Sequence, residues 1–337
     1  ACRREPVDVT PVWLMRQAGR YMKEYRTIRE KTPFLTMCKT PEVAAEVTLQ
    51  PVERLGVDAA ILFSDILVPV EAMGVSLRFS EDRGPVISQP IRDRKAVEAL
   101  NIIEPEEEVS FVMEAIRIIR RELDGKVPLI GFSGAPFTLA SYLVEGGHSR
   151  NYSVIKAMMY GDSSTYHALM DKLVRVITAY LNAQIDAGVQ AVQLFDSWVG
   201  CLGPGDYEEF VLSHSKQVID GLRNRVPVIH YANCGATLLE LMKRAGGDVI
   251  GIDWRVNLDE AWKRLGYDVG IQGNLDPNVL LAPQDEIDKR VKDILKRADN
   301  RPGHVFNLGH GVLPQTPVEN VSFMVDAVHK YSQRPQK

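Results

Sequence analysis

The stretch Ala59-Ala60-Ile61-Leu62-Phe63-Ser64-Asp65-Ile66-Leu67-Val68 is an apolar run interrupted by a single carboxylate. A run this short and rich in large side chains predicts a β-strand covered on both faces. Asp65 is then expected where the strand leaves the sheet. An ionised carboxylate in apolar surroundings costs on the order of several kcal/mol unless donors or a cation meet it. Two roles therefore stay open for Asp65: a cap for the backbone N–H groups that follow, or a catalytic carboxylate.

Short apolar runs like this one recur along the chain, with amphipathic stretches between them. Thr40-Pro41-Glu42 is expected to open a helix ending at Gly56, and Thr316-Pro317-Val318-Glu319 reads as a capping box. Strands alternating with helices predict the α/β class and a single (β/α)8 TIM barrel domain over residues 1–337. An open doubly wound sheet is the alternative, and the missing GxGxxG motif after the first run counts against it. The eight runs are Val12–Met15, Ala59–Phe63, Pro128–Phe132, Ala191–Phe195, Val226–His230, Asp248–Ile252, Asp268–Ile271 and His304–Leu308.

Composition limits the classes of protein that the sequence fits. The 337 residues are 45% hydrophobic and 25% charged, with a net charge of −4. This balance predicts neither nucleic-acid binding nor attachment to an anionic membrane, and no apolar stretch is long enough to span a bilayer. The four cysteines lie far apart without CxxC spacing, which favours reduced thiols and a cytoplasmic location. A plastid stroma is the alternative if a transit peptide has been removed.

In a barrel of this kind the chemistry lies at the C-terminal ends of the strands. Polar residues follow every one of the eight runs, so we expect the active site among them. They include Arg16-Gln17-Ala18-Gly19-Arg20 after the first run, Ser64-Asp65 after the second, Tyr142 beyond the third, Ser197 after the fourth and Gly309-His310-Gly311 after the last.

The segment from Arg16 to Lys39 reverses the sign of charge in an acidic protein. It holds seven basic residues against two acidic ones. Arg16 and Arg20 are four positions apart and share one face if a helix begins here. Guanidinium groups match carboxylates or phosphates in two-point contacts, so Arg16 is expected to bind an anion.

Two further features concern the loops around this site. His310 lies between two glycines that allow a tight turn, and a substrate contact and a hydrogen bond within the loop are both open to it. Residues 145–151 are expected to form a mobile loop that closes over a ligand. The sequence has no Walker A, HExxH or GxSxG motif, which leaves cofactor-free chemistry on a polyanionic substrate.

Several motifs closely resemble the uroporphyrinogen decarboxylase family. They are Pro11-Val12-Trp13-Leu14-Met15-Arg16-Gln17-Ala18-Gly19-Arg20-Tyr21, Phe63-Ser64-Asp65-Ile66-Leu67, Gly134-Ala135-Pro136-Phe137-Thr138, Val144-Glu145-Gly146-Gly147, Gln272-Gly273-Asn274-Leu275-Asp276-Pro277 and Asn307-Leu308-Gly309-His310-Gly311. The resemblance implies a single (β/α)8 barrel, a homodimer, and no metal or organic cofactor. It implies removal of CO2 from the four acetate side chains of uroporphyrinogen III, giving coproporphyrinogen III in heme biosynthesis.

The resemblance also assigns roles to individual residues. Asp65 is implied as the catalytic carboxylate that hydrogen-bonds the pyrrole N–H groups, and Arg16 as a substrate binder and candidate proton donor. The substrate-binding set implied by the family is Arg16, Gln17, Ala18, Gly19, Arg20, Phe34, Asp65, Tyr142, Ser197 and His310.

Two alternatives remain at this stage. His230 and Cys234 faintly resemble the zinc site of corrinoid-dependent methyltransferases of the same superfamily. Here the two residues are four apart instead of two, and a third protein ligand for a tetrahedral zinc is missing. The other alternative is a non-catalytic tetrapyrrole-binding barrel, against which the Arg16, Asp65 and His310 set argues.

Overall fold

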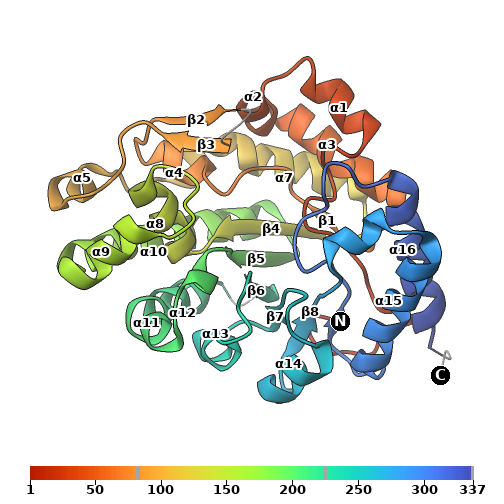
Figure 1. Cartoon of the computed structure of the whole chain (residues 1–337). Coiled ribbons are helices and arrows are strands. Elements are labelled where there is room, and N and C mark those ends of the chain that lie inside the picture. Colours follow the sequence, from red (N-terminus) through yellow and green to blue (C-terminus); the bar gives the residue numbers. More distant parts are fainter. Residues whose placement is uncertain (81–83, 224–225, 335–337) are drawn as a thin grey trace.

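A curled parallel β-sheet surrounded by helices forms the centre of the molecule (Figure 1). The computed structural model describes residues 1–80, 84–223 and 226–334. Neighbouring strands follow the order of the chain and run parallel, which confirms the predicted α/β class. The seven strands of this sheet are β1 (Ala60–Ile61), β4 (Leu129–Gly134), β5 (Ala191–Asp196), β6 (Val228–Ala232), β7 (Val249–Gly251), β8 (Gly270–Gln272) and β9 (His304–Val305).

The first predicted strand, Val12–Met15, forms only an isolated bridge. Val12 pairs in parallel with Phe306. The Phe306 N–H donates to the Pro11 carbonyl at 2.8 Å, and the Asp58 N–H donates to the Val12 carbonyl at 2.8 Å. The segment therefore lies between the chain beyond β9 and the chain that leads into β1.

Side chains end this pairing after the bridge. The Leu14 N–H donates to Gln17 Oε1 and the Met15 N–H to Asn307 Oδ1, each at 3.1 Å. Because side-chain oxygens take the backbone donors that a ladder would use, no regular strand continues. The prediction of a strand over all of Val12–Met15 is wrong for this reason.

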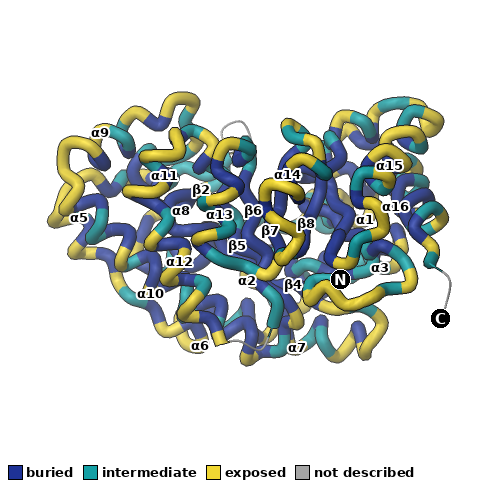
Figure 2. Tube along the Cα trace, turned by 90° about the horizontal axis from the view of Figure 1, so that it is seen from below, coloured by how far each residue is buried: buried dark blue, intermediate teal, exposed yellow. Residues whose placement is uncertain are grey.

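The helices lie around the sheet, with exposed residues on the outside and buried residues within (Figure 2). Helix α3 begins at Pro41 and is followed by Gly56 at φ 68°, as the sequence predicted. The prediction of a capping box at Thr316 is wrong, because Pro317 is the N-cap of α16 and no side chain caps the helix. The helices are α1 (Lys23–Arg29), α2 (Phe34–Lys39), α3 (Pro41–Leu55), α4 (Val68–Ala72), α5 (Arg94–Ala99), α6 (Pro105–Glu108), α7 (Ser110–Leu123), α8 (Pro136–Glu145), α9 (Ser153–Gly161), α10 (Ser163–Ala187), α11 (Pro204–Phe210), α12 (Leu212–Asp220), α13 (Leu239–Ala245), α14 (Leu258–Leu265), α15 (Gln284–Ala298) and α16 (Val318–Ser332), with 3-10 turns η1 (Val199–Cys201) and η2 (Pro277–Leu281).

An antiparallel pair of strands outside the main sheet was not predicted. β2 (Leu77–Ser80) pairs with β3 (Gly84–Ile87). The Ile87 N–H donates to the Gly146 carbonyl at 2.9 Å, which joins the pair to the end of α8. The alternation of Leu77 and Phe79 with polar neighbours was the sequence signal for this pair.

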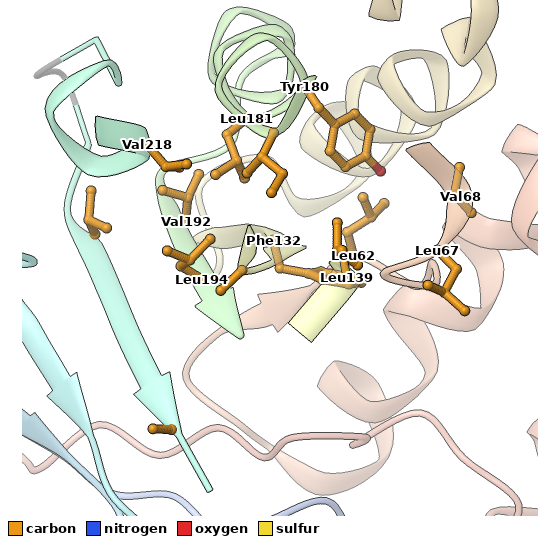
Figure 3. Close-up of a cluster of buried hydrophobic side chains, with 14 of the residues drawn as sticks. Leu62, Leu67, Val68, Phe132, Leu139, Tyr180, Leu181, Val192, Leu194 and Val218 are labelled. Atoms are coloured by element: carbon orange, nitrogen blue, oxygen red, sulfur yellow. The ribbon is translucent and has the colours of Figure 1, made fainter. Parts of the chain in front are cut away.

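Apolar side chains cover both faces of the main sheet. Toward the helices, Leu62, Phe132 and Leu194 pack with Leu181 from α10 (Figure 3). A second cluster, with Ile130, Ile229, Val249 and Val305, fills the other face. Successive strand residues point to opposite faces, so strands buried on both sides read as continuous apolar runs.

A chain of buried polar side chains crosses the inner face of the sheet. Trp13 Nε1 donates to Gln272 Oε1 at 3.0 Å, and Gln272 Nε2 donates to Gln193 Oε1 at 2.9 Å. These bonds tie the N-terminal segment to β8 and β5. Among the described residues, no helix is both long enough and apolar enough to cross a membrane.

Candidate active site

Arg16, the residue after the first predicted strand, has an unusual backbone conformation. Its φ of 60° lies in the left-handed region that residues other than glycine rarely adopt. The turn is held by the Gln17 N–H, which donates to the Leu14 carbonyl at 3.0 Å. A Cβ on Gly311 would overlap the Arg16 side chain, so glycine at 311 makes room for the stem of this arginine.

His310 lies in a turn whose preceding residue, Gly309, is closely packed and hydrogen-bonded. A Cβ on Gly309 would lie 2.6 Å from the Trp254 nitrogen, and the Tyr231 hydroxyl donates to the Gly309 carbonyl at 2.7 Å. Burial lowers the pKa of His310 to about 4, and the neighbouring Arg16 guanidinium adds to the effect. The imidazole is therefore neutral at pH 7, with one nitrogen as donor and the other as acceptor.

Asp65 follows β1 and precedes α4. The residue is partly exposed, and its neighbours along the chain, Phe63, Ile66 and Leu67, are apolar. Its Oδ1 accepts the Leu67 N–H at 2.9 Å. Burial raises the pKa of Asp65 to about 6, opposed by that N–H and by the Arg16 guanidinium. Asp65 is thus a local cap and also a carboxylate whose ionised form is mostly present at pH 7, so its two proposed roles are compatible.

Tyr142 on α8 is influenced by the charges of Asp65 and Arg16. Burial raises its pKa to about 12, with the Asp65 charge adding to the rise and the Arg16 charge opposing it. The Tyr142 ring meets Trp198 edge to face at 5.8 Å. Ser197 immediately precedes Trp198 beyond β5, so the exits of β1, β4 and β5 converge here with Arg16.

Trp198 was not predicted from the sequence, although its place after Asp196-Ser197 at a strand exit was a usable signal. Its backbone N–H donates to Thr138 Oγ1 at 3.3 Å, and that hydroxyl donates to Asp196 Oδ1 at 3.1 Å. Its ring also contacts His148 at 5.4 Å and Tyr152 at 5.8 Å. Trp198 therefore joins a buried carboxylate to the aromatic side chains around Tyr142.

The loop over residues 145–151 is tied to the structure near its start. The Val154 and Ile155 N–H groups donate to Glu145 Oε1 at 3.0 and 3.1 Å. Gly147 forms an antiparallel bridge with Val86, which lies within β3. Closure of this loop over a ligand stays a prediction.

Phe34 packs among aromatic rings next to the segment that carries Asp65, whereas Arg20 is exposed. Phe34 opens α2, and its ring lies 5.9 Å from Phe63 and 4.9 Å from Phe79. Tyr25 also packs on Phe63, at 5.8 Å, and the Arg20 charge acts on the pKa of Tyr25. Phe34 thus lies near the segment that carries Asp65, and contact of Arg20 with a ligand stays a prediction.

The Gln17 side chain is engaged by the protein itself. It is buried, and its Nε2 donates to the Ala59 carbonyl at 3.0 Å. Ala18 and Gly19 are partly exposed in the same loop, and a Cβ on Gly19 would lie 3.2 Å from the Arg16 carbonyl oxygen. Gln17 therefore shapes the loop, and direct contact of these three residues with a ligand stays a prediction.

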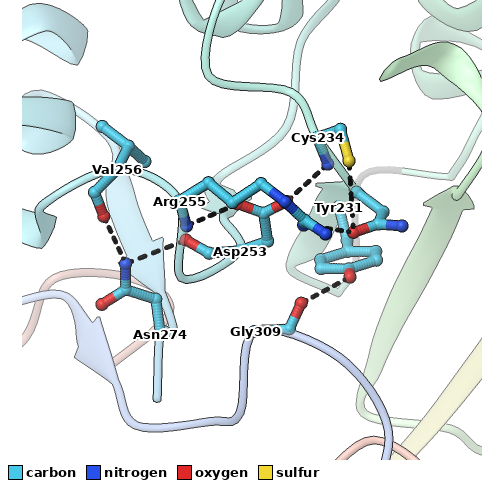
Figure 4. A network of polar contacts seen from close by, with 8 residues as sticks. Tyr231, Cys234, Asp253, Arg255, Val256, Asn274 and Gly309 are labelled. Atoms are coloured by element: carbon cyan, nitrogen blue, oxygen red, sulfur yellow. Dashed lines mark hydrogen bonds and ion pairs between the residues drawn. The ribbon is translucent and has the colours of Figure 1, made fainter. Parts of the chain in front are cut away.

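Polar residues expected at the strand ends, among them Asp253 and Asn274, are joined in a hydrogen-bonded network beyond β7 that the sequence did not predict (Figure 4). Asp253 is buried and accepts hydrogen bonds from the backbone N–H groups of Cys234 and Arg255. Asn274 Nδ2 donates to the Asp253 carbonyl at 2.9 Å. Among the described residues, no group of three His, Cys, Asp or Glu side chains is arranged to hold a metal ion.

The parallel sheet and its surrounding helices define an α/β protein, in which Arg16, Asp65 and His310 lie beyond the carboxyl ends of strands, where such folds place their sites. The chain belongs to the uroporphyrinogen decarboxylase family, whose model matches residues 1–331. It is 60% identical to the uroporphyrinogen decarboxylase of Carboxydothermus hydrogenoformans, over 98% of this chain and 95% of that protein. It is 56% identical to that of Sorangium cellulosum, over 98% and 94% of the two chains.

Solved structures extend the comparison to the fold. A methyltransferase from Methanosarcina mazei aligns with a TM-score of 0.81 at 23% identity, covering 98% of this chain and 96% of its own. A putative vitamin-B12 independent methionine synthase from Listeria monocytogenes aligns with a TM-score of 0.62 at 12% identity, covering 96% of each chain. At these identities the likeness concerns the arrangement of strands and helices alone.

Proposed function

We propose that this protein is a carboxy-lyase that converts uroporphyrinogen III to coproporphyrinogen III in heme biosynthesis, by removing CO2 from four acetate side chains. Family membership supports the reaction. The observation that carries the site is Asp65, a carboxylate in largely apolar surroundings and electrostatically coupled to Arg16 and Tyr142. No nucleic acid or membrane partner is part of the proposal.

Loss of CO2 from an acetate arm requires an electron sink. Protonation of the adjacent pyrrole on carbon supplies one, and positive charge then develops on the ring. The bond between the methylene carbon and the carboxylate breaks, and its electron pair neutralises the ring cation as CO2 leaves. A proton added at the methylene carbon and another lost from the ring leave a methyl group. Asp65, fixed before the reaction, stabilises the developing charge and accepts hydrogen bonds from the pyrrole N–H groups.

Arg16 and Arg20 bind carboxylates of the substrate in this proposal, and Arg16 is the candidate proton donor. An arginine acid is unusual, because the free guanidinium has a pKa above about 12. The neutral state of His310 suits it to donate a hydrogen bond to a carboxylate. The remaining proposed contacts with the substrate come from Gln17, Ala18, Gly19, Phe34, Tyr142 and Ser197.

We also propose that the fold is a closed (β/α)8 barrel that forms a single domain. The β-bridge between Val12 and Phe306 and the hydrogen bond from Trp13 to Gln272 support the N-terminal segment in the place of the eighth strand. The domain is proposed over residues 1–337, of which 335–337 lie outside the described residues. A homodimer and a cytoplasmic location are retained as proposals, and the relatives reported above give no support to a plastid.

The zinc methyltransferase alternative needs a third ligand beside His230 and Cys234. His230 is fully buried, with its Nε2 3.9 Å from Asp196 Oδ2. No suitable group of three ligands exists in the described part of the chain, so we do not propose this function.

The deciding experiment follows carboxylate loss from uroporphyrinogen incubated with the purified protein. The proposal expects stepwise release of four CO2 by the wild type and a far slower release by Asp65→Asn. Tight binding of the tetrapyrrole without CO2 release would refute the decarboxylase and favour a binding protein.

A further inference from the structure

Arg255, directly after Asp253-Trp254, holds its guanidinium in a fixed position (Figure 4). Its Nη1 donates to Asp253 Oδ2 at 2.7 Å and to Asn233 Oδ1 at 3.3 Å. The guanidinium carbon lies 4.1 Å from the centre of the Trp254 ring. A buried carboxylate, an amide and an aromatic face together orient the group before any ligand arrives.

The loop that carries Arg255 is itself held by hydrogen bonds. Asp253 Oδ2 also accepts the Cys234 N–H at 2.5 Å, and Asn274 Nδ2 donates to the carbonyls of Asp253 and Val256. The exits of β6, β7 and β8 therefore hold one another, and the position of Arg255 is set by three strands.

One edge of this guanidinium is left free. Among the described residues, only Nη1 of the Arg255 side chain makes hydrogen bonds, and the side chain is 44% exposed. Arg264 is a useful contrast at 39% exposed, because its Nε and Nη2 bind Glu240 and its Nη1 binds the Ala236 carbonyl. Arg255 can still offer Nε and Nη2 to an incoming carboxylate, whereas all three guanidinium nitrogens of Arg264 already donate a hydrogen bond.

Arg255 lies next to the turn that carries His310. Gly309 packs against Asp253 and Trp254, and Gly311 packs against Arg16. The turn that carries His310 is thus bordered by Asp253 and Trp254, which directly precede Arg255, and on its other side by Arg16. Both guanidiniums lower the pKa of His310, in keeping with this arrangement.

We propose that Arg255 binds a carboxylate of the tetrapyrrole substrate, beside His310 and apart from the reacting group. The inference rests on the proposed function. Asp65 follows β1 and Arg255 follows β7, four places apart in the strand order. Arg255 therefore suits a carboxylate that is not removed, which in this substrate is a propionate. The same contact would persist in the product.

The test compares Arg255→Gln and Arg255→Lys with the matched control Arg264→Gln, which breaks the arginine–carboxylate pair between Arg264 on α14 and Glu240 on α13. Loss of a charge-assisted two-point contact is expected to raise KM for uroporphyrinogen and Kd for coproporphyrinogen about tenfold to a hundredfold. The kcat should change little, because the contact is the same in substrate, transition state and product. Arg255→Lys should show a smaller rise, and the control none.

A purely structural role for Arg255 predicts a different outcome. Arg255→Gln would then lower the melting temperature by removing a partner of buried Asp253, with KM and product Kd unchanged. That result overturns the inference. If Arg255→Gln does not fold, Arg255→Lys keeps a cation beside Asp253, and unchanged product binding in that variant overturns it equally. Failure of the proposed function is distinguishable, because the wild type would then release no CO2.

Discussion

Replacing Asp65 with asparagine removes the charge but keeps an oxygen that can accept the Leu67 N–H, now at 2.9 Å. The substitution also brings an NH2 group toward the pyrrole N–H groups. If the charge acts on the transition state, turnover should fall a hundredfold or more, equivalent to about 2.7 kcal/mol or more. The change should have little effect on the local turn.

Stability should move in the opposite direction. The pKa of Asp65 is about 6 in the folded protein, against an ordinary 3.8. The difference corresponds to at most roughly 3 kcal/mol by which folding disfavours the ionised form. Between pH 4 and 6 the folded state binds more protons than the unfolded state, so this carboxylate makes stability fall as pH rises through that window. Asp65→Asn should therefore melt higher than the wild type at pH 8 and show no such gain near pH 4.

The assay measures turnover and thermal unfolding on the same preparations, each across pH. Wild-type kcat/KM should rise with pH through about 6 as Asp65 ionises, and this limb should be missing in the variant. Asp93→Asn is the control, because Asp93 is an exposed carboxylate whose Oδ1 caps α5 through the Ala96 N–H. Near-normal turnover of Asp65→Asn with a large loss of stability would refute the mechanism and leave Asp65 as a structural cap.

Three further predictions follow from the same geometry. Arg20→Ala should weaken binding of substrate and product about tenfold to a hundredfold in titrations, and unchanged binding of both would assign Arg20 to the solvated surface. Gly311→Ala should raise KM by displacing the Arg16 side chain, while Gly309→Ala should lower the melting temperature more, because its Cβ would press on the Trp254 backbone at 2.6 Å. Decarboxylation should persist after chelator treatment, and activity lost with chelator and restored by zinc would refute the cofactor-free mechanism.

Local sequence was sufficient for much of the fold. Apolar runs predicted all seven strands of the main sheet, because strands buried on both faces need no polar alternation. Helix α3 followed from Pro41 and Gly56, whose backbone preferences act on their immediate neighbours. The strand exits also pointed to Arg16, Asp65 and His310, since the end of a buried run is a local feature.

Tertiary structure decided what depends on residues far apart in the chain. The Met15 N–H is taken by Asn307, 292 positions away, so no local pattern could predict that the first run ends as a bridge. The orientation of Arg255 likewise depends on Asn233 and on Asp253, which is fixed from a neighbouring strand exit. Sequence periodicity records which side chains are buried, and therefore determined the strands and their exits. The donors and charges that fix each side chain and shift its pKa lie far apart in the sequence, and only folding brings them together.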